Sequence, residues 1–361
     1  MNVEEQIKRI EFNKTDGKVL IKLIEDAKDK GSLVRKTSRK IKEKAIKILK
    51  ELSQIEKIIY TEHDLSSKER FLDCCAVGID GSFHTVGSLS SKYYAPFSVV
   101  RIIFERGISD KPEIHVYAAG IEEIDENEHK SVDAEASRRM LLGETKALYD
   151  WNSENIKSLV FIDGPVVDPP GYVDESYVDY RCDAIKISDN SLMIGCVKRC
   201  IDSHFLRYYE KILKLRKGDL MKHFSVDKNL FAYFFTKYRF DNNYNGVLFT
   251  HPLELRDEVS RKYSNYGVRI FSVFFQKDSS SNIIRLDVPM AYGDAFEEKI
   301  FNAIRATCEW TFPGQDIPVP IEIAHEKCKI RGGAAQVIYE EILARAHASD
   351  IEDMVIMRNL G

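Results

Sequence analysis

Ala76-Val-Gly-Ile-Asp80-Gly81-Ser82 and Leu159-Val-Phe-Ile-Asp163-Gly164-Pro165 are two stretches in which an apolar run ends in Asp-Gly. Runs of this length that are rich in Val and Ile are typical of buried strands, and the glycine after each aspartate predicts an immediate turn. Open α/β sheets bind their ligands at the carboxyl ends of such strands. We therefore expect Asp80 and Asp163 to lie together at one edge of a sheet.

A third carboxylate, Glu144, lies between these runs in a stretch with helical spacing, from about Asp133 to Trp151. The residues three and four positions away from Glu144 are apolar: Met140, Leu141, Ala147 and Leu148. Glu144 therefore shares the buried face of the helix, where an ionised carboxylate is costly unless a cation or hydrogen bonds compensate it. We favour a ligand role over a glutamate that reaches solvent at the helix edge. Clustered carboxylates suit Mg²⁺ or Mn²⁺, and a pair of such ions can hydrolyse phosphodiesters.

Two further residues are candidates for the same chemistry. His325 lies on the first turns of a helix that Pro320 opens, and its neighbours at four and three positions, Ile321 and Cys328, predict an inward-facing ring. This ring is either a buried, hydrogen-bonded structural histidine or a ligand of a metal or a phosphate. Lys198 follows an apolar strand and either contacts a scissile phosphate or simply ends the strand.

The order of the predicted elements defines the fold class. Two helices with a break near Gly31-Ser32 fill the charged N-terminus, and the next elements are strands at 72–80, 96–105 and 113–119, a helix at 133–151, a strand at 157–163, a helix at 174–187 and a strand at 192–197. The order β-β-β-α-β-α-β is that of a ribonuclease H-like α/β fold, in which a mixed five-stranded sheet begins with three antiparallel strands and continues through parallel crossovers. Later strands (246–250, 267–275, 283–289) and helices (294–309, 331–347) extend this sheet or form a small cap. We expect an N-terminal helical region (1–65), one domain (66–347) with its core at about 70–200 and a C-terminal extension (201–347), and a tail (348–361).

The composition is that of a globular protein, with 44% apolar residues, 30% charged residues and a net charge of -4. No run approaches the roughly 18 apolar residues of a membrane span, and the N-terminus has no secretory signal, so a cytoplasmic location without a membrane partner is expected. The seven cysteines form no framework or zinc-ribbon spacing, which favours reduced structural thiols over a metal site.

Basic residues are concentrated in two segments. Ten basic residues and only two acids lie between Lys28 and Lys50, and a second cluster at 198–217 is interleaved with Phe and Tyr. Such segments suit phosphate backbones and unpaired bases, although solvated helix faces have the same composition. The residues that we expect to contact DNA are Lys36, Arg39, Lys40, Arg199, Arg207 and Tyr208, with Tyr209 as a second stacking surface.

Taken together, these motifs resemble the NurA nuclease family, the DNA-end-processing nucleases that work with the HerA translocase. The matching elements are Ile79-Asp80-Gly-Ser, the helix Arg138-Arg139-Met-Leu-Leu-Gly-Glu144, Phe161-Ile-Asp163-Gly nineteen residues after Glu144, the strand that ends in Lys198, Arg285-Leu-Asp-Val-Pro289, and Ala324-His325. They cover about residues 70 to 345, and their order and spacing are more specific than any one of them.

The resemblance implies a ribonuclease H-like nuclease that uses Mn²⁺ or Mg²⁺, with two ions expected. It also implies cleavage of single-stranded DNA internally and from 5′ ends, during DNA end resection and repair or in defence, by a homodimer docked on a HerA-type hexameric ATPase. Asp80, Glu144 and Asp163 match the family's metal-binding carboxylates, while Lys198 and His325 match its other active-site positions; we expect His325 to bind a metal or the phosphate. Two positions depart from the family pattern: Ile317 stands where a Tyr is usual, and Phe83 stands where a basic residue is expected.

Two other functions are compatible with parts of this pattern. The missing Tyr motivates a catalytically weak subunit whose main role is to dock on a HerA-type ring ATPase. An actin-like sugar kinase or ATPase would share the core fold, but it needs a duplicated fold and a late Gly-rich adenosine loop. Arg331-Gly-Gly-Ala-Ala is the only candidate for that loop.

Overall fold

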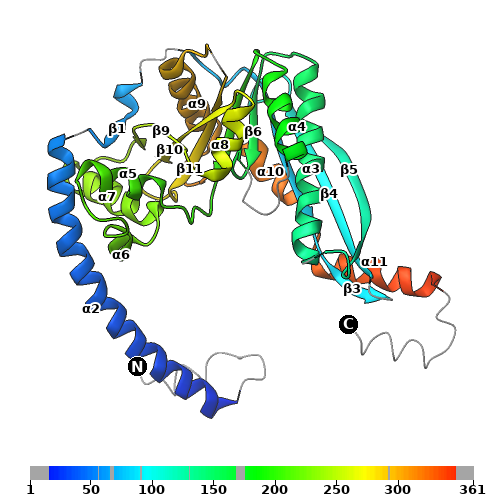
Figure 1. The fold of residues 1–361 in the computed structure, drawn as a ribbon, viewed down its shortest axis with the longest axis horizontal. Helices are drawn as coiled ribbons and strands as arrows, with labels where there is room; N and C mark the ends of the chain where they lie inside the picture. Colours follow the sequence, from blue (N-terminus) through cyan, green and yellow to red (C-terminus); the bar gives the residue numbers. More distant parts are fainter. Residues whose placement is uncertain are drawn as a thin grey trace. The chain divides into compact units, whose positions relative to one another are not determined.

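A computed structural model describes residues 16–55, 57–65, 69–89, 92–129, 131–167, 175–291 and 293–346 (Figure 1). The chain divides into two compact units. The first contains residues 1–57 and 205–226, and the second contains residues 58–204 and 227–361. The predicted tail, 348–361, lies outside the described residues.

The first unit is helical and consists of α2 (Gly17–Ile55), most of α5 (His204–Ile212) and α6 (Met221–Phe224). The predicted break near Gly31 is wrong, because α2 is one continuous helix of 39 residues. A single glycine in a helix costs only about 1 kcal/mol relative to alanine, which is too little to interrupt so long a helix. Buried Glu210 accepts hydrogen bonds from the backbone N–H groups of Gly218 and Leu220, at 2.9 and 2.8 Å, and so ties α5 to the turn before α6.

The second unit is built on one mixed sheet. Its strands are β1 (Ile59–Thr61), β2 (Cys75–Phe83), β3 (Val86–Leu89), β4 (Lys92–Phe104), β5 (Glu113–Asp125), β6 (Ser158–Asp163), β7 (Ser191–Val197), β8 (Leu248–Thr250), β9 (Leu253–Glu254), β10 (Arg269–Gln276) and β11 (Ile284–Met290). The order across the sheet is β1-β8-β10-β11-β7-β6-β2-β4-β3, with β5 on β4 and β9 on β10.

The pairing confirms the predicted ribonuclease H-like core. Strands β2, β4 and β5 are antiparallel, whereas β6 is parallel to β2 and β7 is parallel to β6. The later strands extend this sheet, because β11 pairs antiparallel with β7 and β10 pairs with β11. The very short strands β1, β3 and β9 were not predicted because runs of two to four residues carry little periodic signal.

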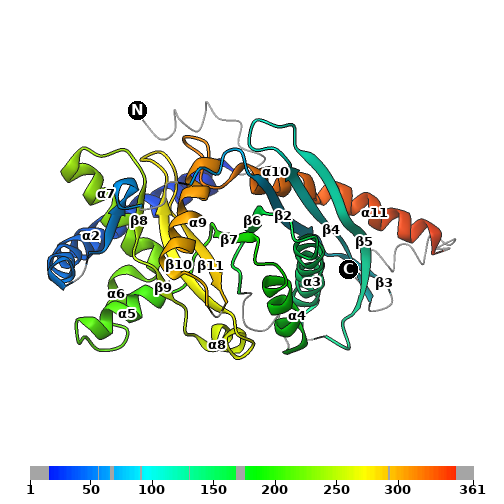
Figure 2. The same ribbon diagram turned by 90° about the horizontal axis from the view of Figure 1, so that it is seen from above.

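Helices cover both faces of the sheet (Figure 2). One face carries α3 (Val132–Ser153), α4 (Glu175–Lys186) and α8 (Glu258–Asn265), and the other carries α9 (Phe296–Trp310) and α10 (Val319–Cys328). The short 3₁₀ helix η1 (Glu62–Asp64) follows β1, while α7 (Asp227–Asn242) packs on β10 and α11 (Gly332–Arg345) packs on β3. None of the helices that the structure describes has the length and apolar character needed to cross a membrane.

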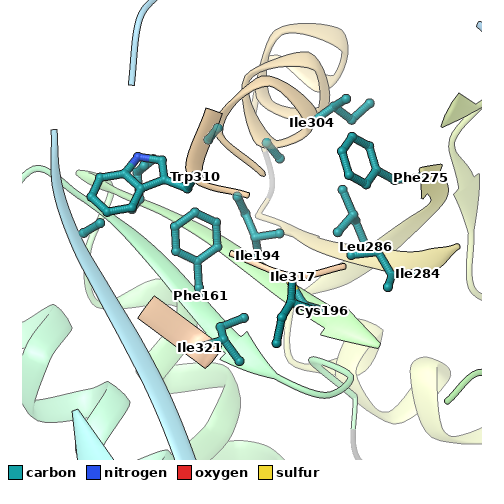
Figure 3. Close-up of a cluster of buried hydrophobic side chains, with 14 of the residues drawn as sticks. Phe161, Ile194, Cys196, Phe275, Ile284, Leu286, Ile304, Trp310, Ile317 and Ile321 are labelled. Atoms are coloured by element: carbon teal, nitrogen blue, oxygen red, sulfur yellow. The ribbon is translucent and has the colours of Figure 1, made fainter. Parts of the chain in front are cut away.

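Alternation along the strands divides the core into two layers. Val77, Ile79 and Val160 face α3 and α4, whereas Ala76 and Phe161 face the α9 and α10 side, where Trp310 and Ile321 join them (Figure 3). Helix α10 approaches β2 very closely at Gly78, where a Cβ atom would lie 2.3 Å from the carbonyl carbon of Pro320. Glycine at position 78 therefore sets the position of α10, the helix that carries His325.

Candidate metal centre

Asp80 and Asp163 share one face of the sheet at neighbouring strands. Asp80 follows the last residue of β2 that pairs with β6, and Asp163 is the last residue of β6. By alternation both side chains lie on the α10 face, with Ala76 and Phe161. The predicted turn at Gly164 is correct, with φ of 119°, but the one at Gly81 is wrong, because β2 continues to Phe83 through its pairing with β4.

His325 completes a three-residue cluster with these aspartates. Its Nδ1 atom lies 3.0 Å from Oδ2 of Asp80 and 3.5 Å from Oδ2 of Asp163. One ligand atom from each residue falls within 4.8 Å of the other two. The side chain is not buried, since 46% of it is exposed. His325 can therefore contact both the carboxylates and a ligand from outside.

Lys198 approaches the same cluster from β7. Its Nζ atom lies 2.5 Å from Oδ2 of Asp163, and its side chain remains partly exposed. The side chain of Lys228 donates a hydrogen bond to the carbonyl oxygen of Lys198 at 3.0 Å. The ammonium group of Lys198 therefore lies beside the carboxylates, just after the end of β7.

Glu144 reaches the centre from the opposite face of the sheet. It lies on α3 and is buried, and its Oε1 atom is 2.7 Å from the place that a Cβ atom on Gly81 would occupy. It lies outside the cluster of three whose ligand atoms are mutually within 4.8 Å. Together with burial, its charge helps to raise the pKa of the Cys328 thiol, which contacts Asp80, so Glu144 lies next to the cluster without being one of its three members.

The electrostatics of the cluster favour a bound cation. Burial and the charge of Asp163 raise the pKa of Asp80 to about 6, although Cys328 and His325 oppose the shift. A buried carboxylate whose charged form is disfavoured by a second carboxylate is stabilised when a cation joins the pair. The two carboxylates are oxygen donors that suit Mn²⁺ or Mg²⁺, and the imidazole adds a nitrogen donor of the kind that transition-metal ions accept, so the residues present fit Mn²⁺ best.

Cys328 is a member of the site that the sequence did not reveal. Its thiol lies 3.4 Å from Oδ2 of Asp80 and 3.5 Å from the carbonyl oxygen of His325, one turn earlier on α10. Burial and Asp80 raise the pKa of this thiol well above its usual value, so it is a protonated donor to the carboxylate. The spacing of three residues from His325 was visible in the sequence, but it indicated only packing. None of the seven cysteines, all of which the structure describes, takes part in a disulfide.

The residues expected to contact DNA are distributed over both units. Lys36 and Arg207 are exposed and Tyr208 is half-buried in the first unit, while Arg199 is exposed in the second, next to Lys198. The side chains of Arg39 and Lys40 lie outside the described residues. The stacking role expected for Tyr209 is wrong, because this ring is fully buried.

The two departures from the family pattern occupy apolar surroundings. Ile317 is buried in the cluster beneath α9 and α10 (Figure 3), and Phe83 packs against the small cluster formed by Ala95, Ile124 and Ala136. Neither position contributes a polar group to the site.

The fold and the acidic cluster define an α/β protein of ribonuclease H-like architecture with a candidate metal centre at its sheet edge. The NurA domain family matches residues 75–330, and the chain therefore belongs to that family. No curated protein matched the chain. The NurA nuclease from Sulfolobus solfataricus has a similar structure, with a TM-score of 0.52 and 13% identity over 93% of this chain and 99% of the other, which shows a shared fold.

Two further structures align less well, with TM-scores below 0.5. A structure of NurA with manganese aligns with a TM-score of 0.42 and 12% identity, over 81% of this chain and 93% of the other. Endonuclease V from Ciona intestinalis in complex with DNA aligns with a TM-score of 0.32 and 12% identity, over 75% and 90%.

Proposed function

We propose that this protein is a metal-dependent nuclease that hydrolyses the phosphodiester bonds of DNA. The observation that carries the proposal is the convergence of Asp80, Asp163 and His325, whose ligand atoms lie within 4.8 Å of one another. Membership of the NurA domain family supports the same activity. Asp80, Asp163 and His325 would hold Mn²⁺ or Mg²⁺, with Glu144 completing the site from the other face of the sheet.

The roles of the residues follow from their positions. A bound Mn²⁺ or Mg²⁺, with two ions expected, would supply Lewis-acid activation of water and of the phosphate. Lys198 is close enough to Asp163 to stabilise negative charge on a phosphate bound at the cluster. The exposed part of the His325 side chain would contact the phosphate or hold a proton during the reaction.

We propose that the substrate is single-stranded DNA, which the protein cuts internally and from 5′ ends. We also propose that the protein is a homodimer, and that it acts with a HerA-type hexameric ATPase in end resection, repair or defence. Exposed Lys36, Arg199 and Arg207 support contacts with the DNA backbone, and Tyr208 would stack on a base. We also propose a cytoplasmic location.

The test is cleavage of single-stranded DNA labelled at the 5′ or the 3′ end, with metal-free protein and increasing Mn²⁺. We expect cleavage by the wild type and a loss of at least a hundredfold in Asp80→Asn and Asp163→Asn. Asp183→Asn is the matched control, because Asp183 is exposed on α4 and pairs only with Lys186 in the ion pairs described. Equal cleavage by the wild type and Asp80→Asn would overturn the proposal.

The same proteins distinguish the alternative of a docking subunit. Calorimetry with Mn²⁺ measures uptake directly, and pull-down with a HerA-type ATPase measures docking. A wild-type protein that binds the ATPase but neither takes up Mn²⁺ nor cleaves DNA would be a docking subunit.

A further inference from the structure

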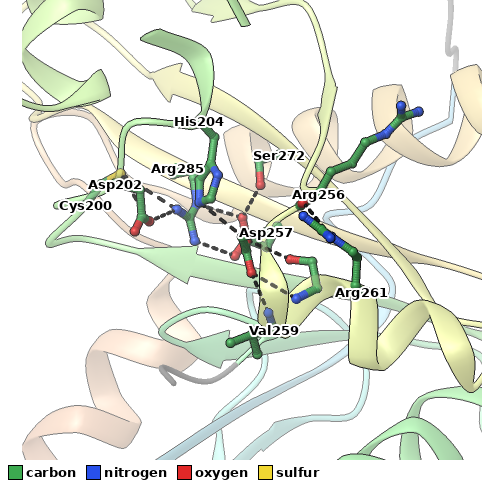
Figure 4. Close-up of polar contacts among 11 residues, drawn as sticks. Cys200, Asp202, His204, Arg256, Asp257, Val259, Arg261, Ser272 and Arg285 are labelled. Carbon is green, nitrogen blue, oxygen red and sulfur yellow. Dashed lines mark hydrogen bonds and ion pairs between the residues drawn. The ribbon is translucent and has the colours of Figure 1, made fainter. Parts of the chain in front are cut away.

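A buried polar network lies on β11, the strand that pairs with β7, on the face of the sheet opposite to Asp163 (Figure 4). The guanidinium of Arg285 is buried, and its Nε and Nη2 atoms each donate to one carboxylate oxygen of Asp287, both at 2.8 Å. Asp287 is itself completely buried and accepts a further hydrogen bond from the Ser272 hydroxyl of β10 at 2.5 Å. This bidentate pair balances the charge of Arg285 within the sheet.

Arg285 also makes a third contact that charge balance does not require. Its Nη1 atom donates to the carboxylate of Asp202, which lies outside the sheet with 38% of its side chain exposed. The carbonyl oxygen of Asp202 accepts a hydrogen bond from the backbone N–H of Asp227 at 2.9 Å. Asp202 therefore connects the segment that follows β7 to both the sheet and the start of α7.

The segment held in this way begins with Lys198. Strand β7 ends at Val197, which pairs with Arg285, and the chain from 198 to 203 has no regular structure. The carbonyl oxygen of Lys198 accepts a hydrogen bond from the side chain of Lys228, the residue that follows Asp227. The backbone that carries Lys198 is thus fixed at one end by the strand and at the other by Asp202.

We propose that Asp202 and Arg285 are positioning residues that hold Lys198 against Asp163 at the metal centre. A lysine side chain loses about 2 kcal/mol of rotamer entropy when it is ordered, so its contact with Asp163 depends on a backbone that is already in place. The connection from β11 through Asp202 supplies that restraint. The expected effect on catalysis rests on the proposed nuclease function. The expected effect on the position of Lys198 does not.

The first experiment measures the position of Lys198 without any activity. Lysines are labelled by reductive ¹³C-methylation, which keeps their charge, and Lys198→Arg identifies the Lys198 signal by NMR. We expect Asp202→Asn to move this signal towards that of an exposed lysine, while Asp183→Asn leaves it in place. An unchanged signal in folded Asp202→Asn would overturn the proposal. Arg285 is left intact, because breaking its buried pair with Asp287 would destabilise the fold.

The second experiment measures the consequence for catalysis with a double-mutant cycle. We expect Asp202→Asn to lower kcat by roughly ten- to a hundredfold with KM almost unchanged, and to have no further effect in a Lys198→Ala background. Asp202→Glu should restore part of the loss. Independent, multiplicative losses would overturn the proposal. If the wild type has no nuclease activity, the proposed function is refuted. The NMR experiment would then still test whether Asp202 positions Lys198.

Discussion

Asp80 and Glu144 reach the same end of strand β2 from opposite faces of the sheet. The Asp80 side chain lies on the α10 face, against His325 and Cys328. Glu144 comes from α3 and lies beside Gly81, the residue after Asp80. The absence of a side chain at position 81 provides the space into which the Glu144 carboxylate extends.

This relationship predicts the effect of Gly81→Ala. The new Cβ atom would lie 2.7 Å from Oε1 of Glu144 and 2.8 Å from Cγ of Met140, so both side chains must move. We expect a folded protein, destabilised by about 1–3 kcal/mol, whose affinity for Mn²⁺ falls at least tenfold, as it also should in Glu144→Gln. Calorimetry measures the affinity. Gly333→Ala is the control, because nothing lies within 4 Å of its Cβ position, and wild-type affinity in Gly81→Ala would refute a ligand role for Glu144.

The raised pKa of Asp80 predicts a pH-dependent cost to the metal-free protein. The pKa of Asp80 is about 6 in the folded chain, whereas its ordinary value, which applies to the unfolded chain, is 3.8. Folding therefore favours the protonated carboxyl. Below pH 3.8 both states are protonated and the cost is absent. It grows as the pH rises from 3.8 to 6, and above 6 it stays constant at about 3 kcal/mol.

Asp80→Asn removes this titration and should therefore stabilise the metal-free protein. We expect a higher Tm than the wild type at pH 8 in the presence of a chelator, and a much smaller difference at pH 4. Added Mn²⁺ should raise the Tm of the wild type only, because the variant lacks a ligand. Thermal unfolding followed by circular dichroism measures each value. A lower Tm for Asp80→Asn at pH 8 would show that the carboxylate is already compensated within the protein.

The sequence predicted the parts of the fold that rest on strong periodic patterns. The apolar runs before Asp80 and Asp163 and the helix that carries Glu144 give unambiguous strand and helix signals, and the order of elements then determines the sheet. The predicted helix break near Gly31 was wrong. Glycine disfavours helices on average, but α2 has enough turns on either side of Gly31 to tolerate it.

The sequence could not predict contacts between elements that are distant along the chain. Cys328 touches Asp80 across 248 residues, and Arg285 touches Asp202 across 83. No local pattern encodes such pairs, since each depends on the register of strands and helices that pack only in the folded state. The exposure of His325 was missed for a similar reason: its helix neighbours Ile321 and Cys328 are buried, but 46% of its own side chain is exposed.

Cys328 is expected to tune Asp80 through its thiol hydrogen bond. Loss of this donor in Cys328→Ala should weaken Mn²⁺ binding by a few-fold, because Asp80 loses a partner that holds its carboxylate in place. Cys328→Ser supplies a shorter but stronger donor and should restore most of the affinity. Electron paramagnetic resonance of free Mn²⁺ gives the bound fraction. Equal weakening in the serine and alanine variants would mean that the volume of the sulfur atom, rather than its hydrogen bond, matters.

Gly78→Ala should displace α10 and with it His325. The added Cβ atom would lie 2.3 Å from the carbonyl carbon and 2.4 Å from the carbonyl oxygen of Pro320, and backbone atoms cannot rotate away as a side chain does. We expect a loss of about 1–3 kcal/mol in the free energy of unfolding and a Mn²⁺ affinity reduced at least tenfold.

Gly31→Ala in α2 is the opposite case. Its Cβ position is empty within 4 Å and alanine favours the helix, so the free energy of unfolding should rise by about 0.5–1 kcal/mol with metal affinity unchanged. Urea unfolding and calorimetry measure both quantities. Wild-type stability and affinity in Gly78→Ala would mean that α10 does not approach β2 as closely as described, and that the position of His325 is set elsewhere.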